Sequence, residues 1–353
     1  MEPQARPVSP HGSLEHEGAE QAAAALTSQR RRLMACLAAE RAELLWQILG
    51  ADDRALGESI IFEQGDWTVK DILAHVAAWD HWEHRMMAAM LTGDQPDFSA
   101  LEEMDAFNAA AVAEWRDRSL GDVLAELQDA RASWLTWLDQ LPRDGFFQSR
   151  PFQGWDWRFP NCLEVQWQHD AEHARQIGAW RKRNVHEGSN GPSVALLAAL
   201  HAARDELLTA AALAPVEERT SRRVCGEWTL KDVLGHVADW EQVGVEGLRD
   251  MAAGSMPQCE HITDIESWNR AHAAERRDEP WEDAWMDLHR VRDELDAVLE
   301  GMTDEALRHV HRFPWGPRGT AYQWVRVFIR HDREHAESLR IAMGVHSERS
   351  GPG

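Results

Sequence analysis

The chain has 353 residues, and its 60 Asp and Glu side chains outnumber its 37 Lys and Arg side chains, which gives a formal net charge of −23. So negative a surface repels phosphate backbones, and no apolar run approaches the roughly 18 residues of a membrane span, so we expect neither a nucleic-acid nor a membrane partner. The N-terminal segment lacks the apolar core of a signal peptide, and no two of the four cysteines form a CxxC pair, which favours a cytoplasmic location and argues against a disulfide framework or a cysteine zinc site.

The first half of the chain begins with a polar tail and continues as helices. Residues 1–25 are polar and acidic, and we expect them to be disordered. Leucines and isoleucines at helical spacing predict a helix over 28–49. Thr68, followed by Asp71, is a typical helix N-cap and predicts a second helix that runs to about Leu91.

Two more long helices are expected in this half. A short helix near 100–117 comes first, and Ser119 with Asp122 predicts the cap of a third long helix. The segment 142–160 is dense in Pro, Gly and aromatic residues, so we expect it to be irregular. A fourth long helix is expected over about 162–183, and almost nothing in this half is typical of a strand.

The second half of the chain repeats the first. GDWTVKDILAHVAAWD (65–80) and GEWTLKDVLGHVADWE (226–241) share ten of sixteen positions at an offset of 161, and HDAEHARQI (169–177) matches HDREHAESL (331–339) at an offset of 162. Matches in the same order at nearly one offset indicate a tandem duplication of a unit the size of a domain.

The repeat defines the domain organisation and the fold class. Residues 185–193 predict a linker between units at 26–184 and 194–345, and residues 346–353 predict a second disordered tail. Four long amphipathic helices in each unit predict an all-α fold of two tandem up-down four-helix bundles. The helices of the second unit are expected near 194–213, 229–253, 263–276, 280–300 and 320–343.

Three histidines recur in both units at the repeat offset. His169 and His173 lie four residues apart and share one face of a helix, and His75 lies on the apolar stripe of a helix that can face them. Three neutral imidazoles on rigid helices can bind one divalent metal ion and leave a coordination position open, as catalytic sites do. We therefore predict a metal site in each unit, and the second set is His236, His331 and His335.

The identity and role of such an ion follow only in part from its ligands. Nitrogen ligands suit zinc, nickel, copper and iron, of which we expect zinc or nickel. The ion would activate a bound water or thiol near neutral pH. A histidine on an apolar stripe is also common in helix cores, so a purely structural role is the alternative.

Four acidic residues lie near the predicted ligands. Asp170 and Glu172 flank the histidines but point to other faces, and Asp80 and Glu241 lie near the second-helix histidines. We do not count them as ligands and expect them on solvated helix faces. The alternative is that they orient the ligand histidines from outside.

An asparagine and a tryptophan also recur and are candidate substrate-binding residues. Asn108 corresponds to Asn269, and Trp79, four residues after His75, corresponds to Trp240. Asn is mildly unfavourable within a helix, so its recurrence predicts a buried hydrogen bond, either to a ligand or between helices. The alternative for the tryptophans is core packing.

Together, the pattern W-[ST]-x-K-D-x-L-x-H and the later HxxxH resemble the DinB/YfiT-like superfamily of four-helix-bundle proteins. The segment that carries Asn108 and the form HDREHAE are especially similar to the ClbS/DfsB branch. The resemblance covers about 28–183 and 194–343. It implies divalent-metal binding by His75, His169 and His173 in the first unit. In the second unit it implies the same role for His236, His331 and His335.

The resemblance also implies a chemistry. Related proteins are thiol-dependent transferases or isomerases, and the ClbS branch includes proteins that protect producers from reactive metabolites by hydrolysis. We therefore expect a protein that acts on small electrophilic metabolites, with a low-molecular-weight thiol as a possible cosubstrate. Alternatives are a protein that sequesters a small-molecule ligand without turnover, or one whose metal sites are structural. Most relatives carry one unit and many dimerise, so the fused pair is expected to form a pseudo-dimer within one chain, and the chain itself is expected to be a monomer.

Overall fold

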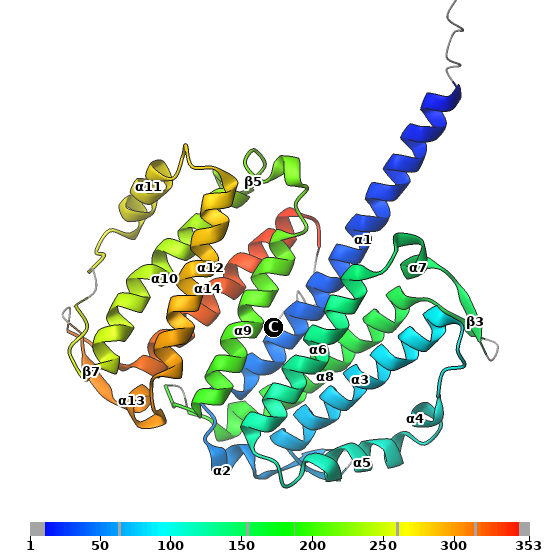
Figure 1. Cartoon of the computed structure of the whole chain (residues 1–353). Coiled ribbons are helices and arrows are strands. Elements are labelled where there is room, and N and C mark those ends of the chain that lie inside the picture. Colours follow the sequence, from blue (N-terminus) through cyan, green and yellow to red (C-terminus); the bar gives the residue numbers. More distant parts are fainter. Residues whose placement is uncertain are drawn as a thin grey trace, which may run out of the picture.

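The computed structural model describes residues 11–62, 65–152, 155–186, 188–258, 261–313 and 316–345. Within these residues the chain forms two helical bundles that lie side by side (Figure 1). Residues 1–10 and 346–353, which belong to the two expected tails, lie outside the described residues.

Four long helices form each bundle, as the sequence predicts, and the all-α fold is confirmed. The first bundle consists of α1 (His11–Ile48), α3 (Val69–Thr92), α6 (Leu120–Gln140) and α8 (Phe159–Asn184). The second consists of α9 (Ser193–Ala211), α10 (Leu230–Ala252), α12 (Trp281–Glu300) and α14 (Ala321–Ala342). In each bundle the first long helix packs on the fourth and the second packs on the third.

Helix α1 begins earlier than the sequence pattern predicts. It starts at His11 rather than near residue 28, so residues 11–25, which we expected within a disordered tail, are helical. Residues 19–26 read AEQAAAAL, and alanine has the highest helix propensity of all residues. In Figure 1 the N-terminal turns of α1 extend beyond the bundle.

The predicted N-caps are confirmed, and one of them explains the Thr and Asp of the repeated motif. Thr68 and Asp71 form a capping box at the start of α3, and Ser119 and Asp122 form one at the start of α6. The motif lysine, Lys70, donates to the carbonyl oxygens of Arg116 and Arg118 at 2.7 Å, and so fixes the C-terminal end of the following short helix to α3.

Short elements connect the long helices. They include four antiparallel strand pairs that the sequence pattern did not predict, because strands of two to four residues are too short to show alternation. In each bundle one pair precedes the second long helix and one precedes the fourth. The segment 142–160, which we expected to be irregular, therefore contains a strand pair. The pairs are β1 (Ser59–Phe62) with β2 (Gly65–Thr68), β3 (Arg150–Phe152) with β4 (Trp155–Trp157), β5 (Arg223–Cys225) with β6 (Trp228–Thr229), and β7 (Val310–Arg312) with β8 (Arg318–Thr320). The short helices are α2 (Asp53–Leu56), α4 (Ser99–Glu102), α5 (Met104–Trp115), α7 (Arg143–Phe147), η1 (Val216–Glu218), α11 (Ile265–Glu275) and α13 (Asp304–Arg308).

The two bundles share a continuous core. Helix α1 packs on α9, whose small alanine side chains allow close approach, and one cluster of buried apolar residues extends across this contact. Tyr322, the single tyrosine of the sequence, is fully buried there and accepts a hydrogen bond from the backbone N–H of Gly50 at 3.0 Å. Arg333 of α14 forms ion pairs with Glu43 of α1 and Glu206 of α9.

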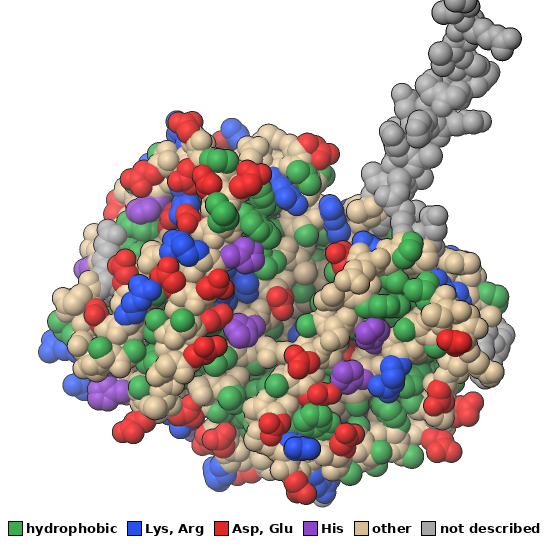
Figure 2. Space-filling view, in the orientation of Figure 1, with side chains coloured by type: hydrophobic (Ala, Val, Ile, Leu, Met, Phe, Trp, Pro, Cys, Tyr) green, Lys and Arg blue, Asp and Glu red, His purple; other side chains and the backbone are tan. Residues whose placement is uncertain are grey.

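The outer surface agrees with the acidic composition. Acidic side chains are spread over both bundles on the face in Figure 2, with basic side chains interspersed among them. None of the described helices combines the length and the apolar character that a membrane span requires.

Candidate metal centres

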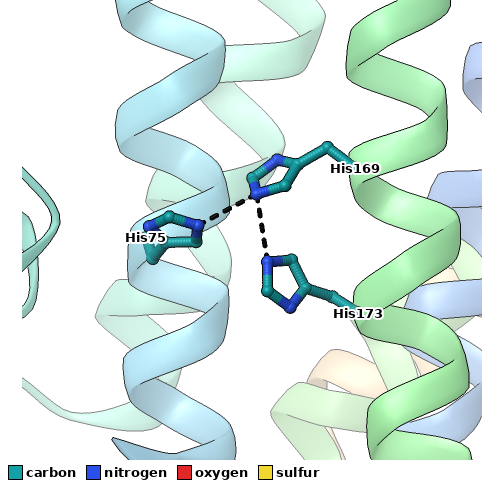
Figure 3. Close-up of side chains that lie close together, drawn as sticks. All are labelled: His75, His169 and His173. Atoms are coloured by element: carbon teal, nitrogen blue, oxygen red, sulfur yellow. Dashed lines mark hydrogen bonds between the residues drawn. The ribbon is translucent and has the colours of Figure 1, made fainter. Parts of the chain in front are cut away.

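In the first bundle the three predicted histidines meet between α3 and α8. His75 projects from α3, and His169 and His173 project from successive turns of α8 (Figure 3). The Nε2 atom of His169 lies 2.9 Å from Nε2 of His75 and 3.0 Å from Nε2 of His173. The same nitrogen of all three rings therefore faces one point.

The second bundle reproduces this arrangement. Nε2 of His331 lies 3.0 Å from Nε2 of His236 and 3.0 Å from Nε2 of His335. Within each trio the ligand atoms lie within 4.8 Å of one another. The sequence repeat thus corresponds to a repeated spatial cluster, and both clusters could hold a metal ion.

The donor set of each cluster fits a divalent ion. One proton on Nε2 of His169 can serve only one of its two neighbours, whereas a cation can accept all three lone pairs. Bonds of about 2.0–2.1 Å from one ion to two imidazole nitrogens require these nitrogens to be roughly 3 Å apart, as they are here. His75, His169 and His173 would hold one ion, and His236, His331 and His335 would hold another.

Burial keeps these imidazoles neutral, as metal ligands must be. Desolvation, followed by the other two imidazoles, lowers the pKa of His75 to about 2 and that of His236 to about 2. Burial likewise lowers the pKa of His169 to about 3 and that of His335 to about 4. Their lone pairs therefore remain available at neutral and mildly acidic pH.

A glutamine orients one ligand of the first cluster. Nδ1 of His173 donates to Oε1 of Gln176 at 2.8 Å, which directs the lone pair of Nε2 toward the other two rings. Gln176 in turn donates to Oε1 of Glu172 at 3.3 Å. Glu172 is exposed, as expected, and its hydrogen bond reaches His173 through this glutamine.

The expectation that the other three acidic residues lie on solvated faces is wrong. Asp80, Asp170 and Glu241 are at most 2 % exposed, and each pairs with two arginines. In the first bundle Arg41 and Arg131 bridge Asp80 and Asp170, with nitrogen–oxygen distances of 2.8–3.1 Å. Burial alone would raise the pKa of Asp80, but the two guanidinium groups hold it below its usual value.

The second bundle contains the same four-membered cluster. Arg204 and Arg292 bridge Glu241 and Asp332 at 2.7–3.0 Å. Asp170 and Asp332 directly follow the ligands His169 and His331 on their helices. Both buried clusters therefore fix the histidine-bearing helices on the side away from the cavity's histidines, and the sequence alone did not assign this role to any arginine.

The recurrent Asn and Trp residues bind each other. Nε1 of Trp79 donates to Oδ1 of Asn108 at 3.0 Å, and Nε1 of Trp240 donates to Oδ1 of Asn269 at 2.9 Å. Each pair joins a short helix to the helix that carries the first histidine. The predicted buried hydrogen bond thus exists between helices, and all four residues also line a cavity beside a histidine cluster.

The cavity beside the first cluster has a volume of about 840 Å³. All three histidines line it, and its walls include Trp79, Trp82, Phe98 and Trp157. Asp156 and Trp157 of β4, in the hairpin before α8, also line it. This is the size and the apolar character of a small-molecule site.

Comparisons with known families agree with the two-unit organisation. Residues 63–162 match the family described as mycothiol maleylpyruvate isomerase N-terminal domain, and residues 199–339 match the DinB superfamily. No curated protein and no solved structure matched the chain. The two family matches fall on successive helical bundles with equivalent histidine clusters, and the chain is therefore a DinB-like protein with two tandem domains.

Proposed function

We propose that this chain is a divalent-metal-dependent enzyme that joins a low-molecular-weight thiol to a small electrophilic metabolite in the cytoplasm. The observation that carries the proposal is the convergence of three neutral imidazoles on the wall of an 840 Å³ cavity. Zinc or nickel would suit these ligands and, when bound, would stabilise a thiolate near neutral pH. The family match of the first bundle, which is named for mycothiol, supports a thiol as the second substrate.

The protein's own residues bind and orient the reactants. His75, His169 and His173 would hold the ion at the wall of the cavity, where a reactant in the cavity could reach it. The aromatic walls would exclude water from an apolar electrophile. Cys162 also lines the cavity, but burial and then the neighbouring Glu83 raise the pKa of its thiol far above neutrality, so the nucleophilic sulfur would come from a cosubstrate.

A fluorogenic reaction tests this proposal. Metal-loaded protein is mixed with mycothiol and monochlorobimane, in which the thiol sulfur forms a bond to carbon, chloride leaves with the electron pair and the thiol proton passes to water. We expect repeated turnover that disappears on chelation and in a His75→Ala, His236→Ala double variant. A rate equal to that of the reactants without protein would contradict a thiol transferase and favour hydrolysis as the next reaction to assay.

Sequestration of a reactive metabolite is the second candidate. The tryptophans of the cavity favour it, because an indole surface binds planar apolar molecules without any reaction. The two candidates differ in stoichiometry. Sequestration would be supported over turnover if the protein removes the electrophile from solution only up to one equivalent per chain and still does so after chelation.

The contact between α1 and α9 supports the expected pseudo-dimer within one chain. These two helices occupy equivalent places in the repeat, and each also packs on the fourth long helix of its own bundle. A protein that already joins two units in this way would act as a monomer. Sedimentation equilibrium that gives the mass of two chains would contradict this part of the proposal.

A further inference from the structure

The two histidine clusters lie beside cavities of different size. The cavity of the first bundle has a volume of about 840 Å³, whereas that of the second has about 370 Å³. The histidines, the tryptophan and the asparagine that line them are equivalent in the repeat. The difference therefore lies among the other lining residues, on the helices and on the segments that connect them.

One pair of equivalent positions narrows the cavity of the second bundle. The equivalents of Glu83 and Gln166 in the second bundle are Gly244 and Phe328, at the same offsets that relate the histidines. Phe328 is buried against Gly244, so closely that a Cβ atom on Gly244 would lie 1.8 Å from its Cζ atom. In the first bundle Gln166 instead donates to Oδ1 of Asp80 at 2.6 Å.

The larger cavity contains a buried acid. Glu83 lines it and is 5 % exposed, and its Oε2 atom has no hydrogen-bond partner among the described residues. Burial, followed by the charge of Asp80, raises the pKa of Glu83 to about 8, so the group is a neutral hydrogen-bond donor at pH 7. A buried polar atom without a partner costs free energy, which a ligand group would recover.

The position of Glu83 gives the cavity two different ends. It lies eight residues after His75 on α3, which at 1.5 Å per residue places the two Cα atoms about 12 Å apart along the helix. Trp79 and Trp82 lie between them in sequence and also line the cavity. The site thus offers a histidine cluster, an aromatic middle and a hydrogen-bonding acid.

We propose that only the first bundle holds the organic substrate, an elongated aromatic or otherwise apolar molecule whose far end carries a carbonyl group that accepts a hydrogen bond from Glu83. Glu83 is then a specificity-determining residue, and the second bundle retains its histidine cluster beside a cavity reduced by Phe328. This inference rests on the proposed function for the reaction at the histidines, but binding of the carbonyl compound does not require that reaction.

A fluorescent ketone tests the inference. Prodan is a neutral naphthalene with a carbonyl at one end, and its emission moves to longer wavelength when that carbonyl accepts a hydrogen bond. We expect one bound Prodan per chain. Glu83→Leu should weaken binding about tenfold and move the emission of the bound dye to shorter wavelength, whereas Glu83→Gln, which keeps a donor, should bind within about threefold of the unaltered protein.

Matched variants separate the two bundles. Trp79→Leu should weaken Prodan binding, whereas Trp240→Leu at the equivalent position should leave it unchanged. Glu246→Leu, at an exposed residue of α10, is the control for replacing a glutamate by leucine outside the cavity. Two equal Prodan sites per chain, equal effects of the two tryptophan variants, or a Glu83→Leu protein with unchanged affinity and emission would overturn the inference.

Chelation distinguishes this inference from the proposed function. Prodan binding is expected with and without metal, because Glu83 and the aromatic walls belong to the chain itself. A protein that binds Prodan through Glu83 but binds no metal would overturn the proposed function and leave this inference standing. Metal binding at both clusters, together with Prodan binding that is unchanged in Glu83→Leu, would overturn this inference and leave the proposed function standing.

Discussion

Arg131 binds Asp80 through two parallel hydrogen bonds, from Nε to Oδ2 at 3.0 Å and from Nη2 to Oδ1 at 2.9 Å. The two side chains are only 5 % and 0 % exposed. Asp80 lies five residues after His75 on α3, so this pair connects a candidate metal ligand to α6. It is half of a cluster that recurs in the second bundle with Arg292 and Glu241.

Removal of one partner from this cluster should destabilise its bundle strongly. Arg131→Met leaves two buried carboxylates with one guanidinium group, and we expect a loss of roughly 3–5 kcal/mol in the free energy of unfolding. Arg292→Met should cost a similar amount in the second bundle. Urea unfolding followed by circular dichroism measures both.

An exposed arginine provides the control for these variants. Arg290 lies two residues before Arg292 and its side chain is 51 % exposed, so Arg290→Met should change the free energy of unfolding by less than about 1 kcal/mol. Equal effects of Arg290→Met and Arg292→Met would show that the buried cluster does not stabilise the bundle.

Glu83 should make stability depend on pH in an unusual direction. Its pKa is raised from about 4.5 in the unfolded chain to about 8 in the fold, so the folded state holds the proton more tightly. The contribution of Glu83 is therefore fully present below pH 4.5 and is lost as pH rises through 8. Glu83→Gln removes this dependence, and at pH 8.5 it should be more stable than the unaltered protein by roughly 2–4 kcal/mol.

The comparison of two pH values isolates this effect. Groups distant from Glu83 titrate alike in both proteins, and the buried thiol of Cys162 stays protonated in the fold at both pH values, so the difference in the free energies of unfolding at pH 8.5 and pH 5 reports on Glu83. The variant should gain little at pH 5. An equal difference at both values would mean that Glu83 has an ordinary pKa and does not carry a proton at neutral pH.

The sequence predicts the histidine clusters well but not what supports them. Each histidine lies within a locally similar segment, so the repeat identifies it. Arg41 lies in LAAERAELL (37–45), which matches LHAARDELL (200–208) at six of nine positions, so the repeat does mark this arginine. Arg131 lies in a segment that diverged between the units, and only its place on an apolar helix stripe marks it as buried. Asp80 and Glu83 are likewise charged residues on an apolar helix stripe, and this position marks them as buried.

The other features that the sequence does not predict depend on contacts between distant segments. That Gln166 turns toward Asp80, and that Phe328 fills the equivalent space against Gly244, follows from side-chain packing between different helices. Spacing along one helix cannot show it. The short hairpins escaped prediction for a similar reason, because each is defined by pairing across a turn rather than by a pattern of its own.

Cys162 should be unreactive in the folded protein. It is 3 % exposed, and the raised pKa of its thiol keeps it protonated at pH 8, whereas Cys36 and Cys225 are partly exposed. We expect iodoacetamide to label Cys36 and Cys225 before Cys162, as measured by peptide mass spectrometry. Early labelling of Cys162 would contradict the assignment of the nucleophilic sulfur to a cosubstrate.

The Trp79–Asn108 hydrogen bond should hold the short helix α5 against α3. Asn108→Leu leaves the indole N–H of Trp79 without its partner, which we expect to cost about 1–3 kcal/mol in the free energy of unfolding. Asn269→Leu is the matched variant in the second bundle. Unchanged unfolding of both variants would assign these asparagines to ligand binding alone.

The most direct test of the account is the metal content of the purified chain, measured by inductively coupled plasma mass spectrometry after reconstitution with zinc or nickel. We predict two equivalents per chain, one equivalent in His173→Ala and in His335→Ala, and none in the double variant. His201→Ala, at an exposed histidine outside both clusters, should retain two. A chain that binds no metal, or one whose metal content is unchanged in the double variant, would contradict the claim that these two clusters are metal centres.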